Sequence, residues 1–276
     1  MKTYLIFDVS YLAYRAFHST GGLSHDGLPT GVLFGVFAEV LRTMERFDCY
    51  NPIFCFDVGK PKRRDILPGY KGSRRKGTMT DEQYEARKEL KASLELLRED
   101  MLPFIGFRNI FWATGYEADD LIATAVKDMN PDEEAIMVSS DEDLYQLLGP
   151  RCLMWNPHKG KPITEKSFEK EYGITPGQWA HVKAMAGCSS DDVPGIQGVG
   201  TKTAIKWIRR ELKPGKIYDR ILLNDTWQAN MELVRLPFAD CPTIKKKRDK
   251  VTVQKWHAAM DEFGFESLKP QVPIAY

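Results

Sequence analysis

Carboxylates gather after four apolar runs of this chain. TYLIFDV reaches Asp8, NPIFCFDV contains Asp57, RNIFWAT leads into GYEADD, and AIMVSS is followed directly by DEDLYQLL. The acidic residues at these four places are Asp8, Asp57, Glu117, Asp119, Asp120, Asp141 and Asp143. Clustered carboxylates repel one another and are costly to bury unless a cation neutralises them. Hard oxygen ligands in such number favour Mg²⁺ or Mn²⁺ over zinc or copper.

The apolar runs predict the strands that would position these acids. Strand-like runs lie at 3–9, 51–58, 108–114, 135–140 and 151–156, and helical patterns lie at 31–47, at 81–101 and after Gly115. Strands alternating with helices predict an α/β domain whose central, mainly parallel sheet has helices on both faces. Because the carboxyl ends of parallel strands border the ligand crevice, the four acidic groups are expected to meet at one edge.

Each acid also has a simpler interpretation when it is taken alone. An Asp after a strand is commonly a turn former or a helix N-cap, and Asp119 also fits a solvated helix start. The repetition at four strand ends favours a metal site, because caps have no reason to be so uniformly charged. Glu117 and Asp120 have i, i+3 spacing and would share one face of a helix.

Positive charge is segregated along the chain although the formal net charge is only +1. Residues 60–76 carry eight basic residues and one acid, and 201–216 and 245–250 are also basic. This distribution suits a protein that grips phosphates with one surface and metal ions with another.

Composition excludes several other classes of protein. No apolar run approaches the roughly 20 residues that span a membrane, and Asp8 comes too early for a secretory segment. Five cysteines without CxxC spacing argue against a disulfide framework or a structural zinc site. We therefore expect a cytoplasmic protein.

Strand signals vanish near residue 164, and short helices with Gly and Pro follow. The predicted division is an α/β core over 1–163 and a helical region over 164–276.

Five motifs, in this order, resemble the 5′-nuclease family: LIFDVSYLAYRAFH, FCFDVGKPKRRDILPGYKGSRR, GYEADDLIA, SSDEDLYQLL and DDVPGIQGVGTKTA. That family includes the N-terminal domain of bacterial DNA polymerase I, bacteriophage 5′-3′ exonucleases and flap endonucleases. The resemblance covers about residues 3–212 and implies a PIN-like nuclease core with a helical DNA-binding region. It also implies hydrolysis of DNA phosphodiesters from 5′ ends by two divalent ions, leaving 5′-phosphates.

The resemblance assigns ligands to both ions. Its motifs place Asp8, Asp57, Glu117, Asp119 and Asp120 around the first ion, and Asp141, Asp143 and Asp191 around the second. The family usually has GD-x-x-DN before the hairpin, whereas this chain reads GCSSDD, so Cys188 replaces an aspartate. A thiolate is a poor ligand for Mg²⁺. Asp192 or water would fill the position, or the second ion would be weakened or changed.

The resemblance also assigns DNA contacts. Lys71, Arg74 and Arg75 fall in a basic arch near 60–100, with Lys71 and Arg74 expected to act on the scissile phosphate and Arg75 on DNA. A solvated basic loop is the alternative. Tyr70 is expected to stack on a base, or else to pack in the core.

Residues 176–212 resemble a helix-hairpin-helix motif. Gly198 and Gly200 would let a phosphate approach the backbone, and Lys202 and Lys206 would add charge. A turn or helix cap is the simpler interpretation of the glycines. The resemblance adds K⁺ as a candidate ion at this hairpin.

The expected partner is DNA with 5′ ends, flaps, nicks or gaps, with RNA–DNA hybrids as further substrates. We expect a free-standing monomer from a bacterial or phage-infected cell. Three alternatives stay open: a PIN-like ribonuclease, an RNase H-type primer-removing nuclease, and a catalytically weakened DNA-binding homologue.

Overall fold

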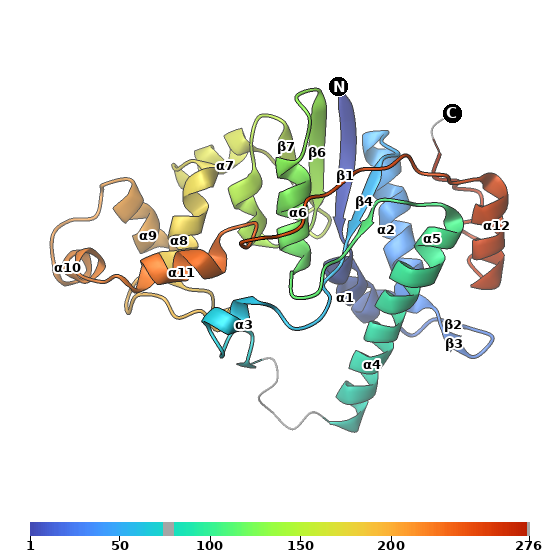
Figure 1. Ribbon diagram of the computed structural model, residues 1–276, viewed down its shortest axis with the longest axis horizontal. Coiled ribbons are helices and arrows are strands. Elements are labelled where there is room, and N and C mark those ends of the chain that lie inside the picture. The colour runs from blue at the N-terminus through green and yellow to red at the C-terminus, as the bar shows by residue number, and fades with distance from the viewer. Residues whose placement is uncertain (74–79, 275–276) are drawn as a thin grey trace.

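The computed structural model describes residues 1–73 and 80–274, and its centre is a six-stranded sheet. The strand order is β5-β4-β1-β6-β7-β8, and the neighbouring strands are parallel except for β7 and β8. Helices lie on both faces of this sheet, as Figure 1 shows. The predicted α/β class with a mainly parallel sheet is confirmed.

The elements have the following bounds. The strands are β1 (Lys2–Asp8), β2 (Ser24–His25), β3 (Leu28–Pro29), β4 (Pro52–Cys55), β5 (Ile110–Phe111), β6 (Glu133–Val138), β7 (Cys152–Asn156) and β8 (Lys161–Ile163). The α-helices are α1 (Val9–Thr20), α2 (Gly31–Phe47), α3 (Arg63–Ile66), α4 (Asp81–Leu96), α5 (Leu102–Ile105), α6 (Ala118–Lys127), α7 (Glu165–Tyr172), α8 (Trp179–Ala186), α9 (Thr201–Ile208), α10 (Lys216–Leu222), α11 (Thr226–Val234) and α12 (Val253–Glu262). A π-helical segment, η2 (Leu97–Met101), and 3-10 segments η3 (Glu142–Leu147), η4 (Pro176–Gln178) and η5 (Ser189–Asp191) complete the list.

Several of the strands differ from the prediction or were not predicted at all. The strand expected over 108–114 is reduced to β5, and neither β8 nor the β2–β3 hairpin was predicted. β8 is an antiparallel edge strand of sequence Lys-Pro-Ile, so it lacks the apolar signal of a buried strand. The hairpin turn uses Asp26 and Gly27, both with positive φ, at 49° and 79°.

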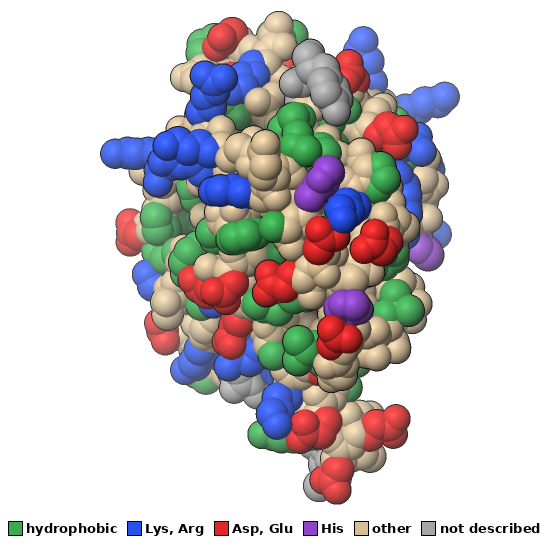
Figure 2. Space-filling view, turned by 90° about the vertical axis from the view of Figure 1, so that its right-hand side faces the viewer, with side chains coloured by type: hydrophobic (Ala, Val, Ile, Leu, Met, Phe, Trp, Pro, Cys, Tyr) green, Lys and Arg blue, Asp and Glu red, His purple; other side chains and the backbone are tan. Residues whose placement is uncertain are grey.

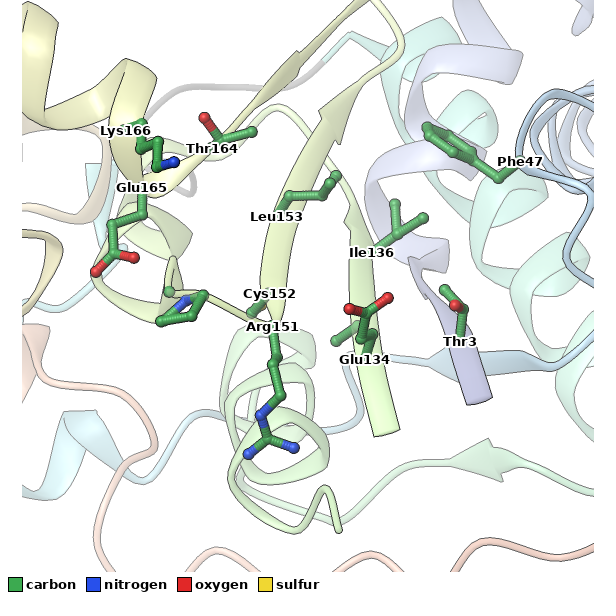
Figure 3. A pocket seen from close by; sticks show the side chains of 13 residues that line it. Thr3, Phe47, Glu134, Ile136, Arg151, Cys152, Leu153, Thr164, Glu165 and Lys166 are labelled. Atoms are coloured by element: carbon green, nitrogen blue, oxygen red, sulfur yellow. The ribbon is translucent and has the colours of Figure 1, made fainter. Parts of the chain in front are cut away.

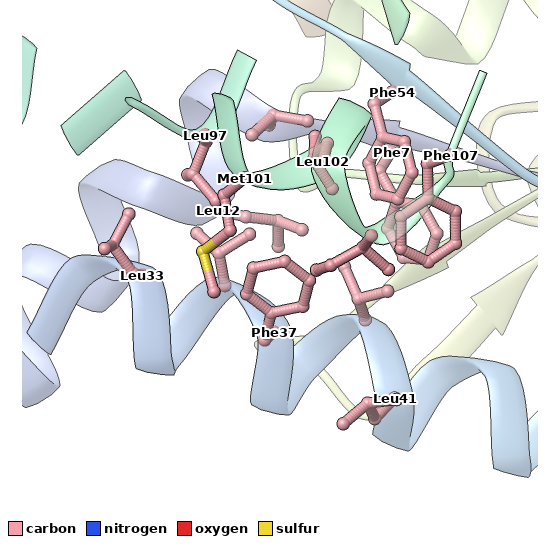
Figure 4. Close-up of a cluster of buried hydrophobic side chains, with 14 of the residues drawn as sticks. Phe7, Leu12, Leu33, Phe37, Leu41, Phe54, Leu97, Met101, Leu102 and Phe107 are labelled. Carbon is pink, nitrogen blue, oxygen red and sulfur yellow. The ribbon is translucent and has the colours of Figure 1, made fainter. Parts of the chain in front are cut away.

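Strand β1 divides the hydrophobic core into two layers. Leu5 and Phe7 face a cluster formed with α1, α2, α5 and α12, whereas Tyr4 and Ile6 face a cluster formed with α6, α7 and α8. Figure 4 shows part of the first cluster, where Phe7 packs against Phe54 with ring centroids 5.6 Å apart. Successive residues of a strand point to opposite faces, so the four residues from Tyr4 to Phe7 are all apolar because both faces of β1 are covered there.

The C-terminal part of the chain does not form one separate helical region. Residues 244–251 run back beside β5 and β6, and α12 packs on the first core cluster, with Trp256 5.7 Å from Phe37 between ring centroids. In Figure 1, α7–α11 lie on one side of the sheet and α12 on the other. The predicted division at residue 163 therefore fails for α12, because its apolar face completes the core of the α/β domain.

The carboxyl ends of β1, β4 and β6 point toward α1 and α3 at the bottom of Figure 1. The face that carries α12 shows charges of both signs interspersed with hydrophobic side chains in Figure 2. Within the two described ranges, no helix combines the length and the apolar character needed to cross a bilayer.

Candidate metal centre

Four aspartates converge where the parallel strands end. Asp8 is the last residue of β1, Asp57 follows β4, Asp141 follows β6, and Asp119 lies in the first turn of α6. Asp57 and Asp141 both act electrostatically on Asp8, and all three act on Asp119. We call Asp8, Asp57, Asp119 and Asp141 the four-aspartate cluster. The structure brings these acids together as expected, and their role as metal ligands stays a prediction.

Neighbouring groups fix the orientation of two of these carboxylates. The backbone N–H of Tyr11 and the hydroxyl of Ser139 donate to the two oxygens of Asp8 at 2.9 and 3.0 Å. The backbone N–H of Ala118 donates to Asp57 at 2.8 Å, which ties the end of β4 to the start of α6. Fixed carboxylates of this kind are suited to hold a cation, since little side-chain freedom remains to be lost.

Burial and mutual repulsion outweigh the nearby positive charge of Lys71 at this cluster, since Lys71 only partly offsets the rise in the pKa of Asp119. Burial, reinforced by Asp57, raises the pKa of Asp8 to about 7. Burial also raises the pKa of Asp119 well above its usual value, with further contributions from Asp141 and Asp8. Within residues 1–73 and 80–274, no Lys or Arg forms an ion pair with a member of the cluster. An all-oxygen group with unbalanced negative charge fits a hard divalent cation such as Mg²⁺ or Mn²⁺.

A second group of donors lies beside the first. Asp143, Cys188 and Asp191 each place one donor atom within 4.8 Å of the others, and we call them the three-donor group. Cys188 Sγ lies 3.5 Å from Asp191 Oδ2, and Lys183 Nζ lies 2.7 Å from Asp143 Oδ1. Burial, with repulsion from Asp141, raises the pKa of Asp143 although Lys183 opposes the shift. Cys188, the residue that differs from the family's usual aspartate, thus lies at a site that could hold a metal.

Asp192 does not stand in for the missing carboxylate. Its Oδ2 accepts the backbone N–H of Ser73 at 2.7 Å, and its backbone is left-handed, with φ of 58°. The carboxylate therefore bonds the segment that leads toward α4 and lies outside the three-donor group. The other possibilities for Cys188, a water at this position or a weakened or changed second ion, stay predictions.

Asp120 does not fit its expected role as a ligand. It is fully buried, and both of its oxygens are occupied by the guanidinium of Arg63 at 2.6 and 2.7 Å. The backbone N–H groups of Glu117 and Phe238 donate to the same carboxylate at 3.1 and 2.8 Å. The Asp120 carboxylate thus accepts four hydrogen bonds, and it holds Arg63 in place. The i, i+3 spacing that suggested a shared ligand face instead serves a capping box at the start of α6.

Glu117 and Tyr70 form a buried polar pair beside Arg63. The Tyr70 hydroxyl and Arg63 both donate to Glu117 Oε2, each at 2.9 Å. Tyr70 is only 4% exposed, which favours its alternative interpretation as a core residue, and its stacking on a DNA base stays a prediction. Burial alone would raise the pKa of Glu117, but Lys71 and Arg63 bring it below its usual value.

Lys71 lies close to both the four-aspartate cluster and the three-donor group. Its ammonium pairs with Glu117 and lies 3.7 Å from Asp191 Oδ1. Burial lowers the pKa of Lys71, but Glu117 and Asp191 outweigh burial and raise it above its usual value, so the side chain is charged at neutral pH. Arg74 and Arg75 lie outside the described residues, and their roles stay predictions.

The hairpin region has the predicted helices and exposed lysines. Helices α8 and α9 pack together, and Gly200 precedes the first residue of α9. Gly198 has φ of 82°, a conformation that favours glycine, whereas a side chain at Gly200 would meet no neighbour within 4 Å. Lys202 and Lys206 are exposed on α9. The loop thus offers free N–H groups and positive charge to a phosphate, and DNA contact there stays a prediction.

A separate cavity of about 330 Å³ lies at the opposite end of the sheet. Figure 3 shows Thr3, Ile136 and Arg151 among its lining side chains. Thr3 is the second residue of β1 and Asp8 is the last, so roughly 16 Å separates this cavity from the four-aspartate cluster at the rise of an extended strand. The cavity is therefore distinct from the acidic centre.

Comparison with known proteins decides the family. Residues 3–173 match the family model of the 5'-3' exonuclease N-terminal resolvase-like domain. A 5'-3' exonuclease of Bacillus subtilis is 32% identical over 231 residues, which is 80% of this chain and 73% of that protein. The chain belongs to the 5′-3′ exonuclease family. This membership confirms the resemblance seen in the five motifs.

Two further relatives of the 5′-3′ exonuclease family extend the comparison. The thermostable DNA polymerase I of Thermus thermophilus is 32% identical over 209 residues, or 74% of this chain, and the chain spans only 24% of that polymerase. A bacteriophage T5 flap endonuclease, in complex with DNA and metal ions, superposes with a TM-score of 0.70 at 19% identity. The superposition covers 99% of each chain, so the fold of this exonuclease-family member extends over its helical region.

Three residues that contribute to the site were not singled out from the sequence. Arg63 and Arg64 are adjacent residues of the same type. Only their positions around α3 decide that Arg63 is buried and Arg64 is not. Lys183 precedes Cys188 by about one turn, which gives a weak signal at most. Ser139 directly follows β6, and its hydroxyl reaches Asp8 because β1 and β6 are neighbours in the sheet.

Proposed function

We propose that this protein is a structure-specific nuclease that hydrolyses DNA next to 5′ ends and flaps and leaves 5′-phosphates. The observation that carries the proposal is the four-aspartate cluster, whose unbalanced negative charge lies at the carboxyl edge of a 5′-3′ exonuclease fold. The T5 relative, a flap endonuclease bound to DNA and metal ions, supports both the substrate class and the need for metal.

We propose two divalent ions as the cofactors, with Mg²⁺ or Mn²⁺ at the all-oxygen site. The four-aspartate cluster would hold the first, and Asp143 and Asp191 with Cys188 would hold the second. When bound, such ions supply an activated water and stabilise the leaving oxygen. No covalent nucleophile from the protein is needed.

The other residues would bind and orient the DNA. Lys71 is charged and lies at the edge of the three-donor group, so it would attract the scissile phosphate, with Arg74 and Arg75 close by in sequence. Gly198, Gly200, Lys202 and Lys206 would hold the duplex through its phosphates without reading its sequence. K⁺ at this hairpin remains part of the proposal.

Cleavage of defined substrates tests this function. We expect a 5′-labelled flap and a nicked duplex to be cut in Mg²⁺ or Mn²⁺, and chelator to stop cleavage while DNA binding persists. Product lengths distinguish removal of single nucleotides from release of whole flaps. Cleavage from 3′ ends, or cleavage that chelator leaves unchanged, would overturn the proposal.

RNA is the second substrate to test. The exposed hairpin lysines and the basic segment before α4 favour DNA duplexes, which a short PIN-like ribonuclease would not need to grip. Matched flaps with RNA and DNA 5′ strands separate a DNA nuclease from a PIN-like ribonuclease or a primer-removing enzyme. Binding without cleavage of either flap would identify a catalytically weakened homologue. We expect the protein to act as a monomer in the cytoplasm of a bacterial or phage-infected cell.

A further inference from the structure

The two metal-binding groups differ in the chemistry of their donors. The four-aspartate cluster offers only oxygen, whereas the three-donor group offers one sulfur and two carboxylates. We propose that the Asp143–Cys188–Asp191 group binds a thiophilic divalent ion, of the zinc, cobalt or cadmium class, in preference to Mg²⁺. This inference rests on the proposed function in one respect only, namely that a metal ion binds at this edge of the sheet.

The three donors come from separate segments that the fold brings together. Asp143 lies in η3 after β6, Cys188 immediately precedes η5, and Asp191 ends η5. Cys188 is 8% exposed and Asp191 9% exposed, so the surrounding structure restricts both side chains. The backbone also fixes Cys188, whose N–H donates to Val193 while its carbonyl accepts from Val193, at 2.9 and 3.0 Å. Restricted donors within 4.8 Å of one another form a site that a small ion can bridge.

The sulfur of Cys188 faces polar partners. Part of the residue packs with Ala184 and Val193, but Sγ lies 3.0 Å from Ser190 Oγ and 3.5 Å from Asp191 Oδ2. Cys55 and Cys152, by contrast, are packed in the apolar cluster beneath the sheet. The Cys188 sulfur is thus already directed at one of the two carboxylates with which it would share an ion.

Charge and coordination number both suit this class of ion. On binding, a sulfur–metal bond forms and the thiol proton passes to solvent. A thiolate and two carboxylates then carry three negative charges, which one divalent ion and the ammonium of Lys183 balance. Three protein donors with an open position resemble catalytic zinc sites, whereas Mg²⁺ demands near-octahedral oxygen ligands.

Titration of the full-length protein with Co²⁺ and with Cd²⁺ tests the proposal. A cobalt or cadmium thiolate gives a sulfur-to-metal charge-transfer band in the near ultraviolet, which carboxylate ligands do not give. We expect wild type to develop this band, and Cys188→Ser to lose it and to bind Cd²⁺ at least about tenfold more weakly. Cys241→Ser is the matched control, since Cys241 is the partly exposed free cysteine among the described residues, and it should retain the band.

A second variant keeps the test decisive if Cys188→Ser folds poorly. Cys188→Asp restores an all-oxygen group, so we expect no band and at least about tenfold tighter Mn²⁺ binding at this site, counted by electron paramagnetic resonance. A band that persists without Cys188, or no band in wild type, would refute the inference. Cleavage of the flap substrate by wild type in any of Mg²⁺, Mn²⁺ or Co²⁺ is a separate readout. Its failure would defeat the proposed function whatever the spectra show.

Discussion

The two acidic groups at the carboxyl edge of the sheet are neighbours, yet their charges are balanced in opposite ways. The four-aspartate cluster has raised pKa values at Asp8 and Asp119 and no ion pair to a described Lys or Arg. In the three-donor group, Lys183 pairs with Asp143, and Lys71 lies 3.7 Å from Asp191. The first group therefore needs an external cation more strongly than the second, although both lie on the same edge.

Arg63 shows how the fold gives different roles to neighbouring acidic residues. Glu117, Asp119 and Asp120 are almost adjacent in sequence, but Arg63 binds the first and third and leaves the second toward the four-aspartate cluster. A buried carboxylate with a guanidinium partner is already neutralised and has little to gain from a metal. Local charge balance, more than the mere presence of an acid, decides which residues are available to a cation.

Removing one unbalanced charge should have the largest effect. We expect Asp119→Asn to lower cleavage on the order of 10³-fold, because a metal contributes several kcal/mol of transition-state stabilisation. DNA binding should remain, which a gel-shift assay in Ca²⁺ would show. Asp219→Asn, at an exposed position on α10, is the matched control. Wild-type cleavage by Asp119→Asn would contradict the assignment of the cluster.

Removing the buried guanidinium of Arg63 should destabilise the folded protein. Arg63→Met leaves Asp120 buried without its partner, so we expect the free energy of unfolding to fall by about 3–5 kcal/mol. Arg64→Met should cost about 1 kcal/mol, since Arg64 donates one bond, to the Lys71 carbonyl at 3.1 Å. Urea unfolding of the two variants measures the difference. Equal losses would mean that Asp120 does not depend on Arg63.

The dependence of stability on pH should distinguish the unbalanced cluster. Asp8 binds its proton more tightly in the folded chain, with a pKa of about 7 against 3.8. Metal-free protein should therefore lose stability as pH rises from about 4 to 7, on the order of 3 kcal/mol. Asp8→Asn, or saturating Mn²⁺, should flatten this slope in thermal unfolding. A metal-free protein whose stability rises over this range, with the same slope in Asp8→Asn, would show that burial and the neighbouring Asp57 do not raise the pKa of Asp8.

Changes remote from both groups should have the smallest effect. Lys202→Ala and Lys206→Ala should each reduce the salt dependence of DNA binding by about one unit of slope, because each removes one phosphate contact. Cleavage at saturating DNA should change little. Lys255→Ala, at an exposed position on α12, is the control and should leave the slope unaltered. Identical slopes for all three variants would exclude the hairpin as a phosphate-binding surface.

The sequence predicted the features that depend on local pattern. Helix α2 coincides with the periodic run at 31–47, and the acids after β1, β4 and β6 lie together as the parallel sheet requires. These predictions succeed because apolar period and strand order determine the edge at which each acid emerges.

Features that depend on distant partners could not be predicted in this way. Tyr70 was expected at the DNA surface, but its hydroxyl binds Glu117, 47 positions away in sequence. Arg63 reaches Asp120 and the carbonyl of Leu233, separated from it by 57 and 170 positions. No local pattern distinguishes a buried Arg from an exposed one when the buried contact is made by a residue so far along the chain.

The long reach of the Arg63 contacts sets an order of events during synthesis. The motifs that bear Asp8, Asp57 and Asp119 leave the ribosome first, but the carbonyl of Leu233 and the N–H of Phe238 emerge far later. Helix α12, which closes the first core cluster, emerges later still. A nascent chain thus carries its acids long before these late contacts can fix them in place, and the enzyme should become competent only when α12 is free to dock.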